Sequence, residues 1–350
     1  MTYPAATGRR PTITDVARAA GVSTAVVSYA LNGRPGVSAA TRERVMRIAD
    51  ELGWRPSAAA RSMRAGARAA GLALVEGAGV HGAPALEVVG ALQRALAAHQ
   101  LAVELRVVDD EAAAAEAYAQ WWAEKRCDVV VVPDVREDDP RLATVRRLGI
   151  PAALLATPGL EPDISAVEVD DGDAYGRVGR YLVGLGHARV AVVTGAGDRI
   201  RSGVIARGLE GALGQTDGAV VSVATDGSPE GAAAAARRLL TQPAPPSAIV
   251  FETDIMAIAA LDVARRTGIA VPWDLSIVAG SDSTLCRLAT PALTSLPSVA
   301  AMLGAALAQA VVAAQQRRVE RVPLSVGSLA VRGSTGPRGS ASRGVEGGVS

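Results

Sequence analysis

Residues 12–53 read TITDVARAAGVSTAVVSYALNGRPGVSAATRERVMRIADELG, and this stretch decides how the N-terminal part of the chain folds. Its first segment begins at Thr12, with Asp15 three residues later, an arrangement close to a capping box. Apolar residues at helical spacing follow, and these are Ile13, Val16, Ala17 and Ala20. Gly21 then interrupts the pattern and permits a tight turn. The spacing therefore predicts a short helix that ends at this glycine.

Two further short helices are predicted after this turn. Ser23 can cap the second helix, which ends at Asn32-Gly33. Ser38 can cap the third, which ends at Gly53 and turns inward Val45, Ile48, Ala49 and Leu52. Helices this short are not stable alone, so we expect the three to pack into one small domain.

The second predicted helix has two unlike faces. Its apolar face consists of Val26, Val27, Ala30 and Leu31. Its opposite face consists of Thr24, Ala25, Ser28 and Tyr29, which are small or carry hydroxyl groups. A capped, exposed second helix after a glycine turn is typical of the helix-turn-helix, whose outer face enters the DNA major groove. The alternative is a plain three-helix bundle that binds no nucleic acid.

Charge is distributed unevenly along the chain. The whole sequence has a formal net charge of +1. Residues 1–68 hold eleven arginines and four acidic residues, a net +7, so the remainder stands at −6. A basic N-terminal part attached to a mildly acidic remainder fits a domain that binds a polyanion. A solvated basic face with no partner is the alternative that charge alone leaves open.

The same N-terminal residues resemble the LacI/GalR family of repressors. The similarity is carried by TITDVARAAGVS at residues 12–23 and by Val27-Ser28, Leu31-Asn32, Val37-Ser38, Thr41-Arg42, Val45, Leu52-Gly53 and Arg55-Pro56. This resemblance implies that Thr24, Ala25 and Tyr29 read bases and that Ser28 contacts a phosphate. The chain departs from the family at Val26, where threonine is usual, and at Tyr29, where arginine is frequent. Family rules for the operator sequence therefore transfer poorly.

A short segment over residues 57–64 is predicted to be a hinge. Its alanines favour a helix, but eight residues are too few for a stable one, so we expect it to fold only when docked. The family resemblance implies that it folds on the operator and pairs with its dimer mate, with Met63 as an apolar wedge in the minor groove where the family usually has leucine. Arg34, Arg61 and Arg64 are available for DNA phosphates. The alternative is a linker with no contact to DNA.

From Gly71 onward, apolar strand-like runs alternate with alanine-rich helical stretches. The runs are Leu72–Val75, Leu101–Val108, Val129–Val132, Ala152–Leu155, Val190–Val193, Ala219–Val223, Ala248–Phe251 and Leu275–Val278. The helical stretches are Leu86–Ala98, Glu111–Lys125, Tyr175–Leu185, Gly231–Leu240 and Met256–Thr267. Such alternation predicts parallel sheets covered by helices on both faces. A stretch of this length predicts two lobes, with a crossover near Ala166–Gly172.

This body resembles the same family and the periplasmic sugar-binding fold that the family shares. The supporting motifs are Asp170-Asp171, Leu185-Gly186-His187, Asp254-Ile-Met-Ala257, Gly268 with Val271-Pro272, Gly280-Ser-Asp282 and Thr290-Pro291-Ala-Leu-Thr294. Ligands in such sheets bind beyond the carboxyl ends of the strands, here in the cleft between the lobes. The resemblance therefore implies an effector, a sugar or related metabolite, between the lobes.

Four residues are candidates for effector contacts. Asp282 follows a strand end and is the best candidate for a ligand hydroxyl; Asp254 also follows one and fits a structural role equally well. The family's effector arginine aligns with Ile205, so Arg207 is the nearby residue that would replace it through a small shift. His81 lies in the first-lobe loop, where the family usually has Asn-Pro-Phe. Since several family sugar contacts are missing, a different small molecule, or none, stays open.

Other classes of protein are disfavoured by what the sequence lacks. It shows no Gly-x-Ser-x-Gly elbow, metal-ligand cluster or complete dinucleotide motif, so we expect no enzyme, cofactor or metal. No apolar run is long enough for a membrane helix and no secretory signal is evident, which argues against the alternative of a solute-binding protein for transport. Cys127 and Cys286 show no redox spacing and fit buried thiols in the cytoplasm. The expected partners are double-stranded operator DNA, a small effector and a second copy of the chain, because one head contacts too few bases for specificity.

The predicted fold class is a small all-α helix-turn-helix head plus an α/β two-lobed body like that of periplasmic binding proteins, with parallel sheets. The predicted boundaries are a flexible arm at 1–11, the helix-turn-helix domain at 12–56, the hinge at 57–65, the body at 66–332 and a Gly/Ser-rich disordered tail at 333–350.

Overall fold

A computed structural model describes residues 11–31, 35–54, 69–75, 85–196 and 199–338. The chain separates into two compact units, residues 1–67 and 68–350, and each is described by itself. Residues 1–10 of the predicted arm, the hinge, and the residues Arg34, Arg61, Met63, Arg64 and His81 lie outside the described residues.

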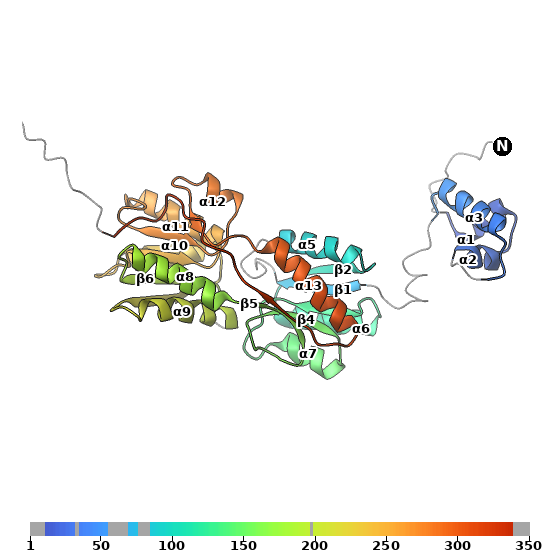
Figure 1. Cartoon of the computed structure of the whole chain (residues 1–350), viewed down its shortest axis with the longest axis horizontal. Coiled ribbons are helices and arrows are strands. Elements are labelled where there is room, and N and C mark those ends of the chain that lie inside the picture. Colours follow the sequence, from blue (N-terminus) through green and yellow to red (C-terminus); the bar gives the residue numbers. More distant parts are fainter. Residues whose placement is uncertain (1–10, 32–34, 55–68, 76–84, 197–198, 339–350) are drawn as a thin grey trace, which may run out of the picture. The chain divides into compact units, whose positions relative to one another are not determined.

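The head, residues 11–54, contains three packed helices, α1 (Ile13–Ala20), α2 (Thr24–Leu31) and α3 (Ala39–Glu51) (Figure 1). Their caps form as the sequence predicts. The Thr12 amide donates to Asp15 Oδ2 at 2.8 Å, and Gly21 ends α1 with a φ of 65°. Ser23 and Ser38 accept backbone N–H groups at the starts of α2 and α3. The core consists of Val16, Ala17, Ala20, Val27, Ala30, Val45, Ile48 and Ala49.

The first lobe of the body is a six-stranded parallel sheet in the order β11-β5-β4-β3-β1-β2. Its strands are β1 (Ala69–Val75), β2 (Ala102–Val108), β3 (Val129–Val132), β4 (Ala152–Ala156), β5 (Ser165–Val169) and β11 (Arg321–Leu324). Its helices are α5 (Ala85–Ala97), α6 (Glu111–Ala123), α7 (Pro140–Leu148) and α13 (Ala300–Gln315), which flank this sheet (Figure 1).

The second lobe repeats this design with a five-stranded parallel sheet in the order β10-β9-β8-β6-β7. Its strands are β6 (Arg189–Thr194), β7 (Ala219–Ala224), β8 (Ala248–Phe251), β9 (Ser276–Ala279) and β10 (Thr294–Ser295). Its helices are α8 (Asp171–Gly184), α9 (Ile200–Leu213), α10 (Pro229–Leu240), α11 (Asp254–Arg266) and α12 (Thr284–Leu288). The predicted fold class, with its parallel sheets, is confirmed.

The lobes are joined by three crossings of the chain, where the sequence predicted one. The predicted crossing is present, because β5 ends at Val169 and α8 begins at Asp171. The chain then returns to the first lobe for α13 and β11, and crosses again to the second lobe, where Ala330 bridges Ser295. The sequence did not predict the strand β11, because it is short and contains Pro323. Proline lacks an N–H, which suits the edge of a sheet.

Helix α13 consists mainly of alanine, leucine and valine. It packs against α5 and the first sheet, and most of its residues are buried. In the described part of the chain, no helix combines the length and apolar character that crossing a membrane requires.

The prediction of a disordered tail from residue 333 is wrong for residues 333–338. Ser334 is fully buried, and its hydroxyl donates to the Ile277 carbonyl at 2.6 Å and accepts from the Thr294 amide at 2.8 Å. The Gly336 carbonyl accepts from Nε2 of His187 at 3.1 Å. The glycine- and serine-rich composition predicted disorder, but these small residues pack closely against the second lobe. Residues 339–350 lie outside the described part.

Candidate DNA-binding surface and effector site

The outer face of α2 carries the residues predicted to read DNA. Val27 and Ala30 are buried at 0% and 2% exposure, and they fix this helix on α1 and α3. Thr24, Ala25 and Tyr29 are exposed, and Tyr29 keeps 43% of its surface accessible. Ser28 is half-buried beside them. The four predicted residues therefore lie on one side of the helix, as a groove-reading surface requires.

Exposed arginines on α1 and α3 add positive charge to the head. Arg18 lies 3.5 Å from Asp15 and Arg47 lies 3.1 Å from Glu51, with the arginine side chains 76% and 66% exposed. Exposed ion pairs of this kind are weak, so the guanidinium groups stay available for phosphates. The predicted phosphate contacts Arg34, Arg61 and Arg64, and the predicted wedge Met63, lie outside the described residues.

Asp282 follows β9 and is fixed in place by two arginines. Its Oδ2 accepts from Arg332 at 2.9 Å and from Arg287 at 3.2 Å. Its Oδ1 is buried and has no hydrogen-bond partner among the described residues. Burial raises the pKa of this carboxyl, but the hydrogen bond and charge of Arg332 outweigh that effect and hold the pKa below its ordinary value. Asp282 is thus an ionised, oriented acceptor with unused capacity.

A second group of charges lies nearby at the carboxyl edge of the same sheet. Arg201 donates through Nε and Nη2 to the two oxygens of Asp171, at 3.1 and 3.2 Å, and through Nη1 to Glu252. The other oxygen of Glu252 accepts from the Gly195 amide at 2.7 Å. Burial lowers the pKa of Arg201, but the charges of Asp171 and Glu252 raise it well above its ordinary value. We call Asp171, Arg201 and Glu252 the buried triad.

The arginine of this site is not the one that the sequence singled out. Arg207 is exposed on α9 and is not among the residues that line the cavity described below. Ile205, with which the family's effector arginine aligns, is fully buried. Arg201 lies four residues before Ile205, so it occupies the same face of α9 one helical turn earlier. The guanidinium reaches the cleft from that position.

Of the other two candidates, one is described. Asp254 begins α11 and is buried, and its Oδ1 accepts from the neighbouring Ile255 amide at 2.9 Å. This contact stabilises the start of the helix, which favours the structural role that the sequence left open. His81 lies outside the described residues.

A small cavity lies between the lobes beside the buried triad. Its volume is about 10 Å³, and its lining residues are Asp171, Arg201, Gly280, Ser281, Leu296, Pro297, Val299 and Val326. Ser281 is 5% exposed, and its hydroxyl has no hydrogen-bond partner among the described residues. A cavity lined by apolar residues and a few polar groups, one of them unsatisfied, is typical of a ligand site.

The two lobes also touch directly beyond this cavity. Arg136, after β3, forms an antiparallel bridge with Arg199, before α9. The Ile200 amide donates to the Val135 carbonyl at 3.3 Å, and Arg199 lies 3.7 Å from Asp134. These contacts close the first lobe onto the second at the start of α9.

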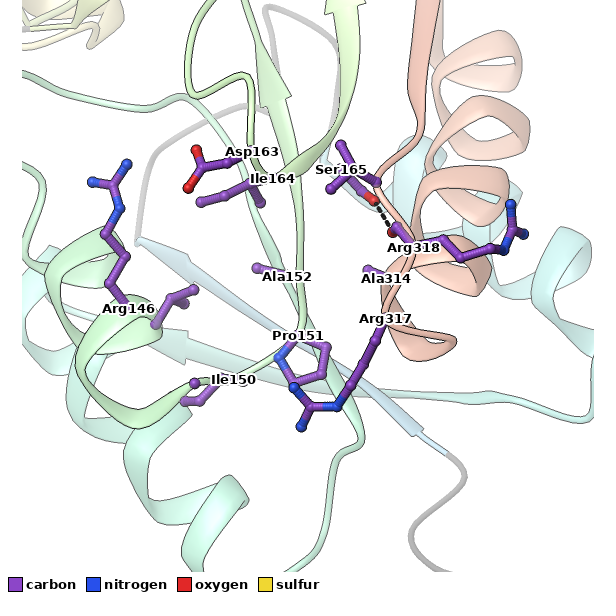
Figure 2. Close-up of a pocket in the computed structure, with 13 residues that line it drawn as sticks. Arg146, Ile150, Pro151, Ala152, Asp163, Ile164, Ser165, Ala314, Arg317 and Arg318 are labelled. Carbon is purple, nitrogen blue, oxygen red and sulfur yellow. Dashed lines mark hydrogen bonds between the residues drawn. The ribbon is translucent and has the colours of Figure 1, made fainter.

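A larger cavity, of about 250 Å³, lies in the first lobe at the amino ends of β4 and β5 (Figure 2). Arg146, Arg317 and Asp163 surround a floor that includes Pro151 and Ala152. Ligands of parallel sheets bind at the opposite, carboxyl edge. The smaller cavity, at the carboxyl edge, is therefore the candidate ligand site in spite of its size.

Sequence reasoning missed the residues that complete the effector site. Arg332 was placed at the end of the body, next to the predicted tail, and Glu252 carries no motif. A signal was present for Arg201, because an arginine one turn from Ile205 reaches the same face of a helix. Arg332, one of the two partners of Asp282, lies fifty residues away from it in the sequence, which no local pattern reveals.

Comparison with known proteins agrees with this geometry. Residues 12–57 match the model for bacterial regulatory proteins of the lacI family, and residues 180–335 match that for a periplasmic binding protein-like domain. The transcriptional regulator AglR of Rhizobium meliloti is 30% identical over 334 residues, which cover 91% of this chain and 92% of AglR.

Two solved structures extend the similarity over nearly the whole chain. The transcriptional regulator CelR in complex with cellobiose matches with a TM-score of 0.70 and 27% identity, covering 93% of this chain and all of that one. The lac repressor dimer bound to operator matches in fold with a TM-score of 0.81 and 24% identity, over 94% of this chain and 100% of that one. With a helix-turn-helix head, a two-lobed body and this similarity, the chain belongs to the LacI family of bacterial transcription regulators.

Proposed function

We propose that this chain is a sequence-specific repressor whose affinity for its operator changes when a small molecule binds beside Asp282. It acts in the cytoplasm, where operator DNA is accessible, and not as an enzyme or as a transport protein. One observation carries the effector part of the proposal: a carboxylate held by Arg332 and Arg287 has a buried oxygen without a partner. Leaving a buried acceptor unsatisfied costs free energy that a donor on a ligand recovers.

The effector is a sugar or a related metabolite. Sugar hydroxyls donate hydrogen bonds, and the unpartnered atoms Asp282 Oδ1 and Ser281 Oγ both accept them. The relative CelR is described in complex with cellobiose, a ligand whose polar groups are hydroxyls and ether oxygens. The same chemistry fits the acceptors of this chain.

DNA is contacted through Thr24, Ala25, Ser28 and Tyr29 in the major groove. The chain binds as a homodimer, because a single short α2 reads too few base pairs for specificity and a two-fold dimer reads two half-sites. Arg34, Arg61 and Arg64 contact phosphates, and Met63 opens a base step in the minor groove. These assignments extend the resemblance of the head to residues outside the described part.

Effector binding changes the arrangement of the lobes. A cavity of about 10 Å³ holds no more than one water molecule, so the lobes must separate to admit a sugar. The Arg136–Arg199 bridge and the Asp134–Arg199 ion pair must break in that step. A ligand with different affinity for the two arrangements shifts their populations, and DNA affinity follows if the head senses the change.

The experiment that tests the proposal starts by selecting operators in vitro from random duplexes with the full-length chain. Fluorescence anisotropy then measures binding of the selected operator and of random DNA, with and without a panel of sugars that includes cellobiose. Tyr29→Ala is expected to cost about 1–3 kcal/mol for the operator and little for random DNA. The matched control is Met46→Ala, an exposed side chain on α3.

Two results contradict the proposal. A wild-type chain that enriches no sequence is not a specific regulator. If no member of a broad panel of sugars and nucleosides changes operator binding, the effector part of the proposal is wrong. The chain is then a regulator without an effector.

A further inference from the structure

The guanidinium of Arg201 is the one positive group among the residues that line the inter-lobe cavity, and its own lobe neutralises it. Three of its five N–H donors bind carboxylates, two on Asp171 and one on Glu252. The three side chains are between 2% and 7% exposed. The buried triad therefore carries a net charge of −1, and two of the arginine's five N–H donors are not engaged by carboxylates.

Glu252 is the one member of the buried triad that is not among the residues lining the cavity. Its carboxylate is held by the Gly195 amide and by Arg201. A carboxylate in a buried position is costly unless it is paired, so its pairing with Arg201 fixes the guanidinium between two acids. Removing its charge would leave Arg201 paired with Asp171 only.

From these contacts we infer that Glu252 sets the charge specificity of the effector site: it turns Arg201 away from anionic ligands, so the site accepts neutral, hydroxyl-rich molecules and rejects phosphorylated or carboxylated ones. The inference rests on the proposed effector site and names its ligand class. A phosphate in this cavity would face the net negative triad, with the carboxylate of Asp282 beyond Ser281. Like charges a few ångströms apart repel strongly in a partly desolvated site. Hydroxyl groups meet no such repulsion, and the unpartnered oxygens of Ser281 and Asp282 accept them.

The other charges around the site do not reverse this balance. Arg332 and Arg287 are both engaged by Asp282 Oδ2, and neither lines the cavity. Asp254, buried nearby at the start of α11, adds a further negative charge. The described residues that line the cavity thus offer an anion no cation except Arg201, which is already paired with two carboxylates.

Inorganic phosphate is the probe that tests this inference without knowledge of the effector. Isothermal titration and thermal-shift measurements with the full-length chain compare wild type with Glu252→Gln, at constant ionic strength. Glutamine keeps the size of Glu252 and one of its two acceptor oxygens, removes the charge, and replaces the other oxygen with an N–H donor that cannot accept from Arg201 or Gly195. We expect wild type to bind phosphate negligibly at millimolar concentration, and Glu252→Gln to bind it at least about tenfold more tightly.

Two further variants make the result specific to Arg201. Glu210→Gln removes an exposed acid from the same helix, α9, and should leave phosphate binding at the wild-type level. The double variant Arg201→Met/Glu252→Met removes both charges and keeps an apolar packing, so the phosphate binding gained by Glu252→Gln should disappear. Circular dichroism melts establish that each variant is folded. A gain in the double variant, or an equal gain in Glu210→Gln, overturns the inference, because phosphate then binds elsewhere.

Matched ligand pairs test the same inference in the wild-type chain. Neutral sugars are compared with their 6-phosphates and uronic acids, for example glucose with glucose 6-phosphate and glucuronate. Tighter binding of a charged member than of its neutral counterpart, or no phosphate gain in Glu252→Gln, overturns the assignment of Glu252. Operator binding is measured in parallel, because its loss in wild type would refute the proposed function rather than the charge specificity.

Discussion

Two buried groups of charges, one in each lobe, use the same chemistry and differ in how completely they are satisfied. In the first lobe, Arg141 binds both oxygens of Asp139, at 2.9 and 2.6 Å, with side chains 3% and 0% exposed. The amides of Arg136 and Arg141 also donate to this carboxylate, at 3.1 and 2.9 Å, and Arg141 donates to the Asp134 carbonyl. Both oxygens of Asp139 have two protein donors.

In the second lobe, charges that are equally buried stand beside groups that lack partners. Asp171 and Arg201 of the buried triad line the inter-lobe cavity together with Ser281, whose hydroxyl lacks a partner among the described residues, as does Oδ1 of the adjacent residue Asp282. Burial and ion pairing therefore do not by themselves mark a ligand site. Unused hydrogen-bonding capacity next to a cavity does, because only a ligand or water can satisfy it.

The largest effect on stability is expected for the fully satisfied Asp139–Arg141 pair of the first lobe. Arg141→Met leaves Asp139 buried without its cation, and we expect a loss of about 3–5 kcal/mol in the free energy of unfolding. Urea denaturation followed by circular dichroism measures it. Arg146→Met is the matched control, since Arg146 is 50% exposed in its pair with Glu161 and should cost less than about 1 kcal/mol. Equal effects of the two variants would mean that the buried pair has no structural role.

The corresponding change in the second lobe should act on binding more than on stability. Asp282→Asn keeps the side-chain shape but removes the charge that a ligand hydroxyl meets, so sugar affinity should fall by about 1.5–3 kcal/mol. The free energy of unfolding should change by only about 1 kcal/mol, because Asp282 and its arginines are partly exposed. Calorimetry with a sugar that binds wild type supplies the first value, and urea denaturation the second. A large loss of stability with unchanged sugar affinity would mean that Asp282 has a structural role, like the Asp139–Arg141 pair.

The smallest predicted effect concerns pH and the C-terminal segment that supplies Arg332. Burial lowers the pKa of His187 below its ordinary value of 6.5, and the charge of Arg338 lowers it further, while the bond to the Gly336 carbonyl opposes them. As the pH falls below about 6.5, the unfolded chain takes up a proton before the folded chain does, so the free energy of unfolding should decrease. Denaturation between pH 7 and pH 5 measures this slope. The slope should flatten in His187→Gln, and an unchanged slope would assign the pH dependence to other groups.

The head shows how far local sequence can carry a prediction. Its three helices, with caps at Thr12, Ser23 and Ser38, formed where the sequence placed them. Each cap acts within three residues, and each buried face repeats at the helical period, so both leave a readable pattern. The alternation of apolar strand-like runs with helical stretches in the body likewise predicted its parallel sheets.

The effector site shows where such prediction stops. Asp282 was identified because it follows a strand, and strand ends gather at one edge of a parallel sheet. The sequence pointed to Arg207, and Arg201 was not considered, because an alignment position cannot show which way a side chain reaches. Candidates at His81 and in the hinge remain predictions, since they lie outside the described residues.

The sequence by itself determined the order of helices and strands, the small reading face of α2 and the two-lobed class of the body, because these depend on short-range periodicity and capping. Only the tertiary structure decided that α13 and β11 return to the first lobe, that residues 333–338 pack on the second, and that Arg332 meets Asp282. These contacts join residues forty or more positions apart. They form when large apolar surfaces are buried together, and no local pattern records which distant side chains that burial brings within hydrogen-bonding distance.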